Sequence, residues 1–131
     1  MKPGLTYEYS FPVEHALTIQ SHNPSLPAVY ATPAMVLAME VAAARAVEAE
    51  LPEGAITVGT AIHVEHLAAT PEGMRVTVRA ELTRVDGRAL EFRVEAFDER
   101  EQIGRGTVGR AIVDAARFAA RVHAKGVPPG P

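Results

Sequence analysis

Glu40 is the residue whose position in this sequence most needs a chemical explanation. It is the only charged residue between positions 31 and 44, in a run with the composition of a helix that is apolar on nearly every face. A buried carboxylate must be paired, be neutralised or take part in chemistry. Glu40 is therefore either one half of an ion pair, with Arg110 or Arg45, or a catalytic group.

Thr32 stands at the head of the same predicted helix, directly before Pro33. A side-chain cap followed by proline is a typical helix start, which gives Thr32 a purely structural interpretation. A helix N-terminus also favours developing negative charge, so Thr32 could act there as a nucleophile or as a donor to a substrate oxygen. Eight residues separate Thr32 from Glu40, a rise of about 12 Å. A substrate or third group must bridge them, or they serve different copies of a dimeric site.

His66 lies on a later predicted strand. The unperturbed pKa of a histidine side chain suits a general base. The alternative is a structural histidine. His63 is three residues away, so on a regular strand the two rings point to opposite faces, which argues against a metal pair. No metal site is predicted. Gly59, on the same strand, could present its backbone N–H to a ligand, or could mark a bulge or a packing requirement.

Periodicity and turn signals predict the helices and strands that carry these residues. A long helix is predicted from Thr32 to about Glu50, and a short one follows a cap at Asp114. Alternating or apolar segments predict strands at residues 5–13, 56–69, 74–85, 89–97 and 103–113. The order is a strand, a long helix and then a meander of four strands. This predicts a single α+β domain, residues 1–125, with an antiparallel sheet wrapped around a central long helix: the hotdog fold.

Composition narrows the functional classes. The chain has 131 residues, 47% of them hydrophobic, a formal charge of −3 and no cysteine. These values predict no nucleic-acid partner and no disulfide or thiolate chemistry. No apolar run reaches the roughly 18 residues of a membrane helix, and no secretory signal is evident, so a cytoplasmic protein is expected. The exposed edges of so small a sheet predict a homodimer. Residues 126–131 are expected to be a disordered tail.

Three segments together resemble the fluoroacetyl-CoA thioesterase-like family of hotdog proteins. They are Tyr30-Ala31-Thr32 through Met39-Glu40, then Gly59-Thr60-Ala61-Ile62 through His66 to Pro71, and Ile103-Gly104-Arg105-Gly106-Thr107 with Arg110. The resemblance implies a catalytic set of Thr32, Glu40 and His66. It also implies that Gly59, Leu26 and Arg110 contact the substrate. Leu26 stands where the fluoroacetyl-CoA enzyme has a lid phenylalanine, and Pro33-Ala34 replaces its Gly-Phe pair.

These features predict an acyl-CoA thioesterase without a cofactor that prefers a short or medium acyl group other than fluoroacetyl. Thr32 would attack or orient the carbonyl, and His66 would transfer the proton. Glu40 would orient His66 or activate water, or would itself be the nucleophile through a mixed anhydride. The main alternative is a non-catalytic dimer that binds acyl-CoA or another small ligand. Dehydration of a hydroxyacyl thioester is a third possibility, but the His-Asp or His-Glu pair usual near the helix start is not evident.

Overall fold

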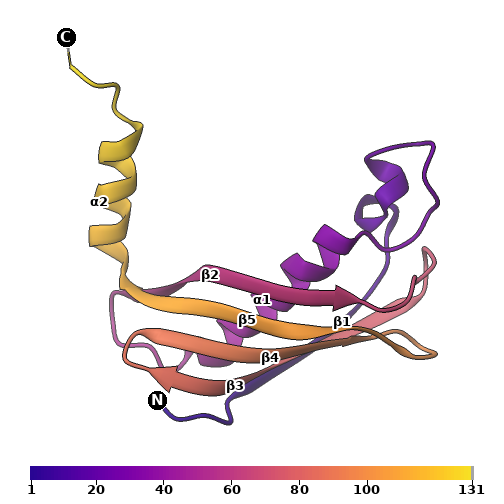
Figure 1. Ribbon diagram of the computed structural model, residues 1–131, viewed down its shortest axis with the longest axis horizontal. Coiled ribbons are helices and arrows are strands. Elements are labelled where there is room, and N and C mark those ends of the chain that lie inside the picture. The colour runs from indigo at the N-terminus through magenta and orange to yellow at the C-terminus, as the bar shows by residue number, and fades with distance from the viewer. Residues whose placement is uncertain (131) are drawn as a thin grey trace.

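The computed structural model describes residues 1–130 and shows one curved sheet with a long helix across its inner face (Figure 1). The sheet contains five strands in the order β1-β3-β4-β5-β2, and every neighbouring pair is antiparallel. The predicted α+β class and hotdog fold are confirmed. The strands are β1 (Thr6–Pro12), β2 (Ala55–His66), β3 (Arg75–Asp86), β4 (Ala89–Phe97) and β5 (Gln102–Asp114). The helices are α1 (Thr32–Glu48), α2 (Ala115–Gly126) and the short 3-10 turns η1 (His15–Leu17) and η2 (Ile19–Ser21).

The predicted four-strand meander is wrong in its first strand. Strands β3, β4 and β5 form a meander, but β2 crosses to the far edge and pairs with β5, from Ala55 opposite Asp114 to His66 opposite Gly104. Strands β2 and β3 do not form a hairpin, because β2 pairs with β5 while β3 pairs with β1 and β4. Strand β2 therefore borders the sheet with its outer edge unpaired within residues 1–130.

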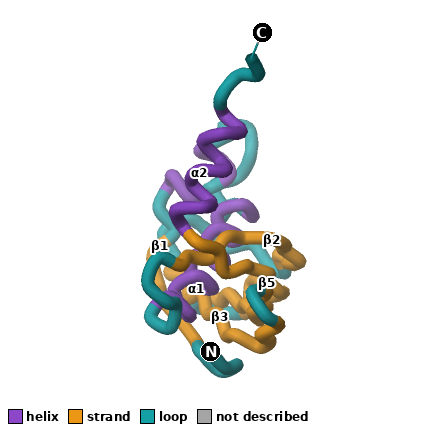
Figure 2. Tube along the Cα trace, turned by 90° about the vertical axis from the view of Figure 1, so that its left-hand side faces the viewer, coloured by secondary structure: helices purple, strands orange, loops and turns teal. Residues whose placement is uncertain are grey.

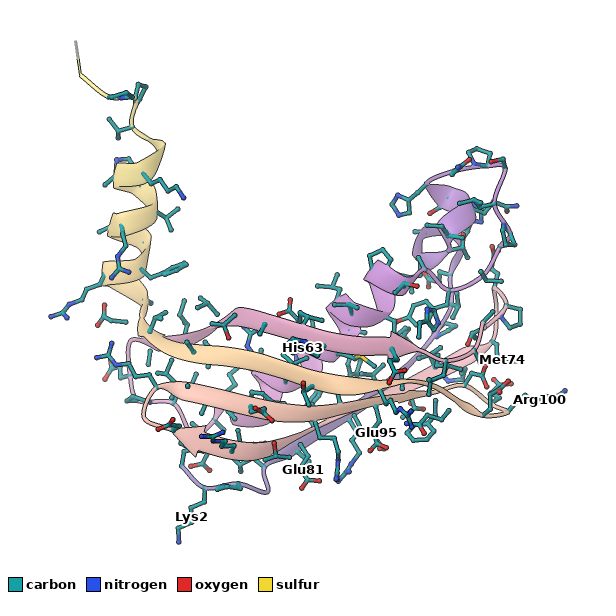
Figure 3. The ribbon with its side chains drawn as sticks, in the orientation of Figure 1. Lys2, His63, Met74, Glu81, Glu95 and Arg100 are labelled. Atoms are coloured by element: carbon teal, nitrogen blue, oxygen red, sulfur yellow. The ribbon has the colours of Figure 1, made fainter. Side chains whose placement is uncertain are left out.

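The core lies between α1 and the inner face of the sheet. Alternate residues of β3 and β4 are fully buried against the helix, as period-two burial requires. The outer face carries charged side chains, among them Glu81 and Glu95 (Figure 3). Close approach of α1 to β5 depends on Gly104, where an added Cβ would lie 2.5 Å from the sulfur of Met35. The helix can therefore settle directly on the strand.

One face of α1 is open, contrary to the expectation that the helix is buried on nearly every side. Leu37 is 62% exposed, and Val36, Glu40 and Val41 are only half-buried. A five-stranded sheet is too narrow to enclose a 17-residue helix from both sides.

Among the described residues no helix is long and apolar enough to cross a membrane. Pro131, in the predicted disordered tail, lies outside those residues, so this part of the prediction stays untested.

Candidate active site

The first residue of α1 and the last residue of β2 meet in a hydrogen bond. Thr32 Oγ1 lies 2.8 Å from His66 Nδ1, although 34 residues separate them. The expected capping role of Thr32 is wrong: the N-cap position belongs to Ala31, and the cap has no side-chain hydrogen bond. The Thr32 hydroxyl, being the first side chain inside the helix, is free to face the strand. The structure thus joins two of the three predicted catalytic residues into a hydroxyl–imidazole pair.

The imidazole of His66 is held in a state suited to accept a proton. Burial lowers the pKa of His66 below its ordinary value of 6.5, and the backbone of Ala68 acts in the opposite direction. The ring is therefore neutral at pH 7. When Nδ1 accepts the hydroxyl proton of Thr32, the ring's own hydrogen sits on Nε2. Nε2 is buried and has no hydrogen-bond partner in the described part of the chain.

A cavity of about 430 Å³ surrounds the pair. Its walls come from the loop before α1, the start of α1 and the segment after β2: Ile19, Val29, Tyr30, Ala31, Thr32, Pro33, His66, Leu67, Ala68 and Ala69. The backbone N–H groups of Thr32 and Ala34 make no hydrogen bond with any described residue, and Pro33 between them has none to offer. The cavity therefore lies at the positive end of a 17-residue helix, with free donors beside the hydroxyl.

Glu40 lies in a second cluster, further along the helix. Its Oε1 is 3.5 Å from Nη1 of Arg110, and Arg110 is held more tightly by Thr57, through Nε to the hydroxyl at 2.9 Å and Nη2 to the carbonyl at 2.8 Å. The Glu40 side chain is 30% exposed, against 11% for Arg110. Burial lowers the pKa of Arg110, and the Glu40 charge opposes that shift. The ion-pair interpretation of Glu40 is thus realised with Arg110.

Gly59 is the residue that lets Glu40 reach the strand. A Cβ added at Gly59 would overlap Oε1 of Glu40, so the carboxylate rests against bare backbone. The pairing of β2 with β5 shifts register directly after Gly59, which is the bulge expected as one alternative. The position of Gly59 is therefore explained by its contact with Glu40.

The two clusters are far apart within one chain. Seven residues of extended strand separate Gly59 from His66, a span of about 23 Å. Glu40 therefore cannot orient His66 of its own protomer. Leu26 is 39% exposed in the loop before α1 and does not line the cavity of Thr32. His63 is exposed on β2 over the middle of the sheet (Figure 3) and takes no part in the site.

Tyr30 is a feature of the site that the sequence pattern did not reveal. Its side chain is 2% exposed and lines the cavity, yet its hydroxyl has no hydrogen-bond partner among residues 1–130. Burial raises the pKa of Tyr30 above its ordinary value. In the sequence Tyr30 stood out only as the first residue of the segment Tyr30-Ala31-Thr32. The hydroxyl is a neutral, buried group without a hydrogen-bond partner among the described residues.

Comparison with known proteins decides the family. The family model described as fluoroacetyl-CoA-specific thioesterase matches residues 13–116. This chain belongs to that family. It is 41% identical to a fluoroacetyl-CoA thioesterase of Streptantibioticus cattleyicolor, over 95% of this chain and 94% of that protein. The predicted family and the predicted class of activity, thioester hydrolysis, are confirmed.

Solved structures agree with this placement. A fluoroacetyl-CoA thioesterase variant in complex with acetyl-CoA is 40% identical, with a TM-score of 0.91 over 97% of this chain and all of that one. A thioesterase superfamily member from Thermus thermophilus is 29% identical, with a TM-score of 0.88 over 95% and 92% of the two chains. A hot-dog-like protein from Thermanaerovibrio acidaminovorans, 23% identical with a TM-score of 0.90 over 98% and 96%, shares the fold.

Proposed function

We propose that this protein hydrolyses short or medium acyl-CoA thioesters as a homodimer, with Thr32 and His66 as the reacting pair. The observation that supports this most directly is the 2.8 Å hydrogen bond between a hydroxyl and a neutral imidazole, beside free N–H groups at the start of α1. A nucleophile hydrogen-bonded to its base is the arrangement that acyl transfer requires. A pure binding protein has no need of it, which argues against the non-catalytic alternative.

The reaction would proceed in two steps. Thr32 Oγ1 attacks the thioester carbonyl while its proton passes to His66 Nδ1, and the oxyanion forms near the free N–H groups of Thr32 and Ala34. The carbon–sulfur bond then breaks, and His66 returns the proton to the thiolate, which releases CoA as the thiol. In the second step a water molecule, deprotonated by His66, attacks the acyl ester of Thr32. The acid leaves and Thr32 regains its proton.

Glu40 enters this scheme through a second protomer. If the unpaired edge of β2 pairs with its own copy in antiparallel register, Ala55 lies opposite the partner's His66. The strand distance from Gly59 to the partner's His66 then falls from about 23 Å to about 13 Å. A bound substrate can span that gap, so that Glu40 of one protomer activates water, or forms the mixed anhydride, in the site of the other.

The β2 edge has the character of such an interface. The exposed apolar side chains of β2 and the residue after it are Ile56, Ile62 and Leu67, which are 37–43% exposed. The open face of α1, with Leu37 and Val41, is a second apolar region that this protomer leaves uncovered. Light scattering at micromolar concentration should give the mass of a dimer. A monomer would contradict the shared site.

A cytoplasmic location stays a prediction, to be tested by fractionating cells that express the protein.

The deciding experiment is a panel of acyl-CoA substrates from two to twelve carbons, with CoA release followed by a thiol reagent. We expect a maximum at a short or medium chain. A single turnover in ¹⁸O-water tests Glu40 as the nucleophile. Attack of water on the Glu40 carbonyl of a mixed anhydride would place label in that carboxylate, whereas hydrolysis of an acyl ester on Thr32 places the label in the released acid. No release of thiol from any substrate would refute the catalytic function in favour of the binding one.

Discrimination between fluoroacetyl-CoA and acetyl-CoA should be modest. Leu26 stands where the fluoroacetyl-CoA enzyme has a lid phenylalanine, and Pro33-Ala34 stands where it has Gly-Phe. Leu26 is exposed and away from the cavity. Apolar pockets separate near-isosteres by only about 1–3 kcal/mol. We therefore expect kcat/KM for fluoroacetyl-CoA and acetyl-CoA to differ by less than about two orders of magnitude. A larger preference for fluoroacetyl-CoA would show that selectivity arises elsewhere in the site.

A further inference from the structure

Three arginines gather in a cavity at the opposite end of the sheet from Thr32. Arg88 comes from the turn between β3 and β4, and Arg117 and Arg121 come from successive turns of α2. The cavity has a volume of about 250 Å³ and is also lined by Ala111, Ile112, Val113, Asp114 and Phe118. Among residues 1–130, five other arginines form ion pairs. None of these three does so with any described carboxylate, and Asp114 instead caps the backbone N–H of Arg117.

The charge of α2 is one-sided. Arg117, Arg121 and Lys125 follow each other at intervals of four residues, and residues 115–126 contain no acidic side chain. Like charges at this spacing repel across the helix surface. The protein as a whole carries a formal charge of −3, so α2 is a cationic element on an acidic molecule. Guanidinium groups without carboxylate partners are suited to phosphate, which they bind bidentately.

The position of α2 rules out a role in its own protomer's active site. The helix leaves the end of β5 and projects past the β2 edge, away from the sheet (Figures 1 and 2). None of its residues is buried, and Val122 is 55% exposed. Its first residue is anchored beside the start of β2, because the N–H of Ala115 bonds to Gly54 at 2.8 Å. Eleven residues of strand, about 36 Å, separate that point from His66.

When β2 pairs in antiparallel register with its copy, α2 comes close to His66 of the partner subunit, although it stays far from His66 of its own protomer. The start of one β2 then lies opposite the end of the other, so α2 stands beside the partner's cavity around Thr32 and His66. We propose that Arg88, Arg117 and Arg121 of one protomer bind the phosphates of the CoA whose thioester occupies the partner's active site. The ligand class is a nucleoside bearing a pyrophosphate and a further phosphate. This inference rests on the proposed dimeric thioesterase and assigns the recognition of its nucleotide to α2.

The first test separates the nucleotide from the thioester. For Arg117→Gln/Arg121→Gln we expect KM for the best acyl-CoA to rise about tenfold to a hundredfold with kcat retained, since two charge-assisted contacts are lost. The matching acyl-pantetheine, which lacks the phosphates, should show the same kinetics in variant and parent. Arg100→Gln, an exposed arginine in the β4–β5 turn, is the matched control. An unchanged KM for acyl-CoA, or an equal loss with acyl-pantetheine, would overturn the proposal.

The second test asks which protomer supplies the arginines. Thr32→Ala chains are mixed with Arg117→Gln/Arg121→Gln chains and the hybrid dimer is isolated. If α2 serves the partner, the hybrid contains one site with both an intact Thr32 and intact arginines, and the parental KM returns. If α2 serves its own protomer, no site has both and KM stays high, which would overturn the arrangement.

A binding measurement keeps this inference distinct from the catalytic one. Calorimetry with adenosine 3′,5′-bisphosphate should show binding to the parent protein and at least tenfold weaker binding to Arg117→Gln/Arg121→Gln. Inorganic phosphate is the second probe, and equal affinity for both would indicate a general anion site and contradict nucleotide recognition. Bisphosphate binding without thiol release from any acyl-CoA would support the arginine site while refuting catalysis. An active enzyme that does not bind the bisphosphate would refute the arginine site and leave catalysis supported.

Discussion

Two clusters connect α1 to β2, and they differ in how completely their polar groups are satisfied. At the start of the helix, Thr32 and His66 share one hydrogen bond, and Nε2 of the ring and the N–H groups nearby are unpartnered within residues 1–130. Eight residues later, Glu40 faces Arg110, which is held by two further bonds to Thr57. The first cluster is poised to bind and react. The second holds a charge in place, and it becomes catalytic only if another protomer brings a site to it.

The strongest test of this contrast removes the base. His66→Ala should lower kcat/KM by about 10²–10⁴, because general-base catalysis contributes on that order. The measurement is thiol release with the best acyl-CoA of the panel. His63→Ala, on the same strand but exposed and outside the site, is the control and should stay within a fewfold of the parent. A damaging His63→Ala together with a mild His66→Ala would reverse the assignment.

Replacing the charge of the second cluster should separate function from stability. Glu40→Gln keeps the shape of the side chain but cannot accept a proton, so we expect turnover to fall by about 10²-fold. The free energy of unfolding should change by less than about 1 kcal/mol, since the pair is part-exposed and Arg110 keeps its bonds to Thr57. Glu48→Gln, exposed on the last turn of α1, is the matched control. A Glu40→Gln variant that is both stable and fully active would confine Glu40 to the ion pair.

Filling the space at Gly59 should disturb only the second cluster. Gly59→Ala places a methyl group where the Glu40 carboxylate lies, so the side chain must move. Such overpacking costs about 1–3 kcal/mol, to be measured by chemical denaturation. Activity should fall by about tenfold, less than with Glu40→Gln, because a displaced carboxylate can still accept a proton. Full activity with the same loss of stability would show that the position of Glu40 does not matter to the reaction.

The smallest expected effect is on pH dependence. His66 must be neutral to accept a proton, and burial lowers its pKa, so the acid limb of kcat/KM should lie below pH 6.5. Because the pKa of His66 is lower in the folded protein than in the unfolded chain, the unfolded chain binds a proton at higher pH than the folded protein does. Stability from this group is therefore complete above pH 6.5 and declines below it. His66→Gln should remove this decline in urea-denaturation curves. An acid limb above pH 6.5 would mean that a different group controls the rate.

Most of the fold was predictable because its signals are local. Period-two alternation located the strands to within three residues, and the apolar run located α1, with its start at Thr32 correct. Strand order was not predictable, because the pairing of β2 with β5 joins residues up to 59 positions apart, Ala55 with Asp114, and leaves no trace in either segment. The sequence also could not show the open face of α1, since that depends on the width of the sheet beneath it.

Residue types and their spacing were enough to show which residues carry chemistry: a lone carboxylate in an apolar helix, a hydroxyl at its start and a histidine on a strand. They also determined the family, because motifs are carried by residue type and spacing. The contacts between these residues could be known only from the folded protein. Thr32 is the hydrogen-bond partner of His66 and not a helix cap. Glu40 lies beside Gly59, far from His66 along β2. The physical reason is that a hydrogen bond depends on distances of about 3 Å, and these are set by long-range packing of helix on sheet.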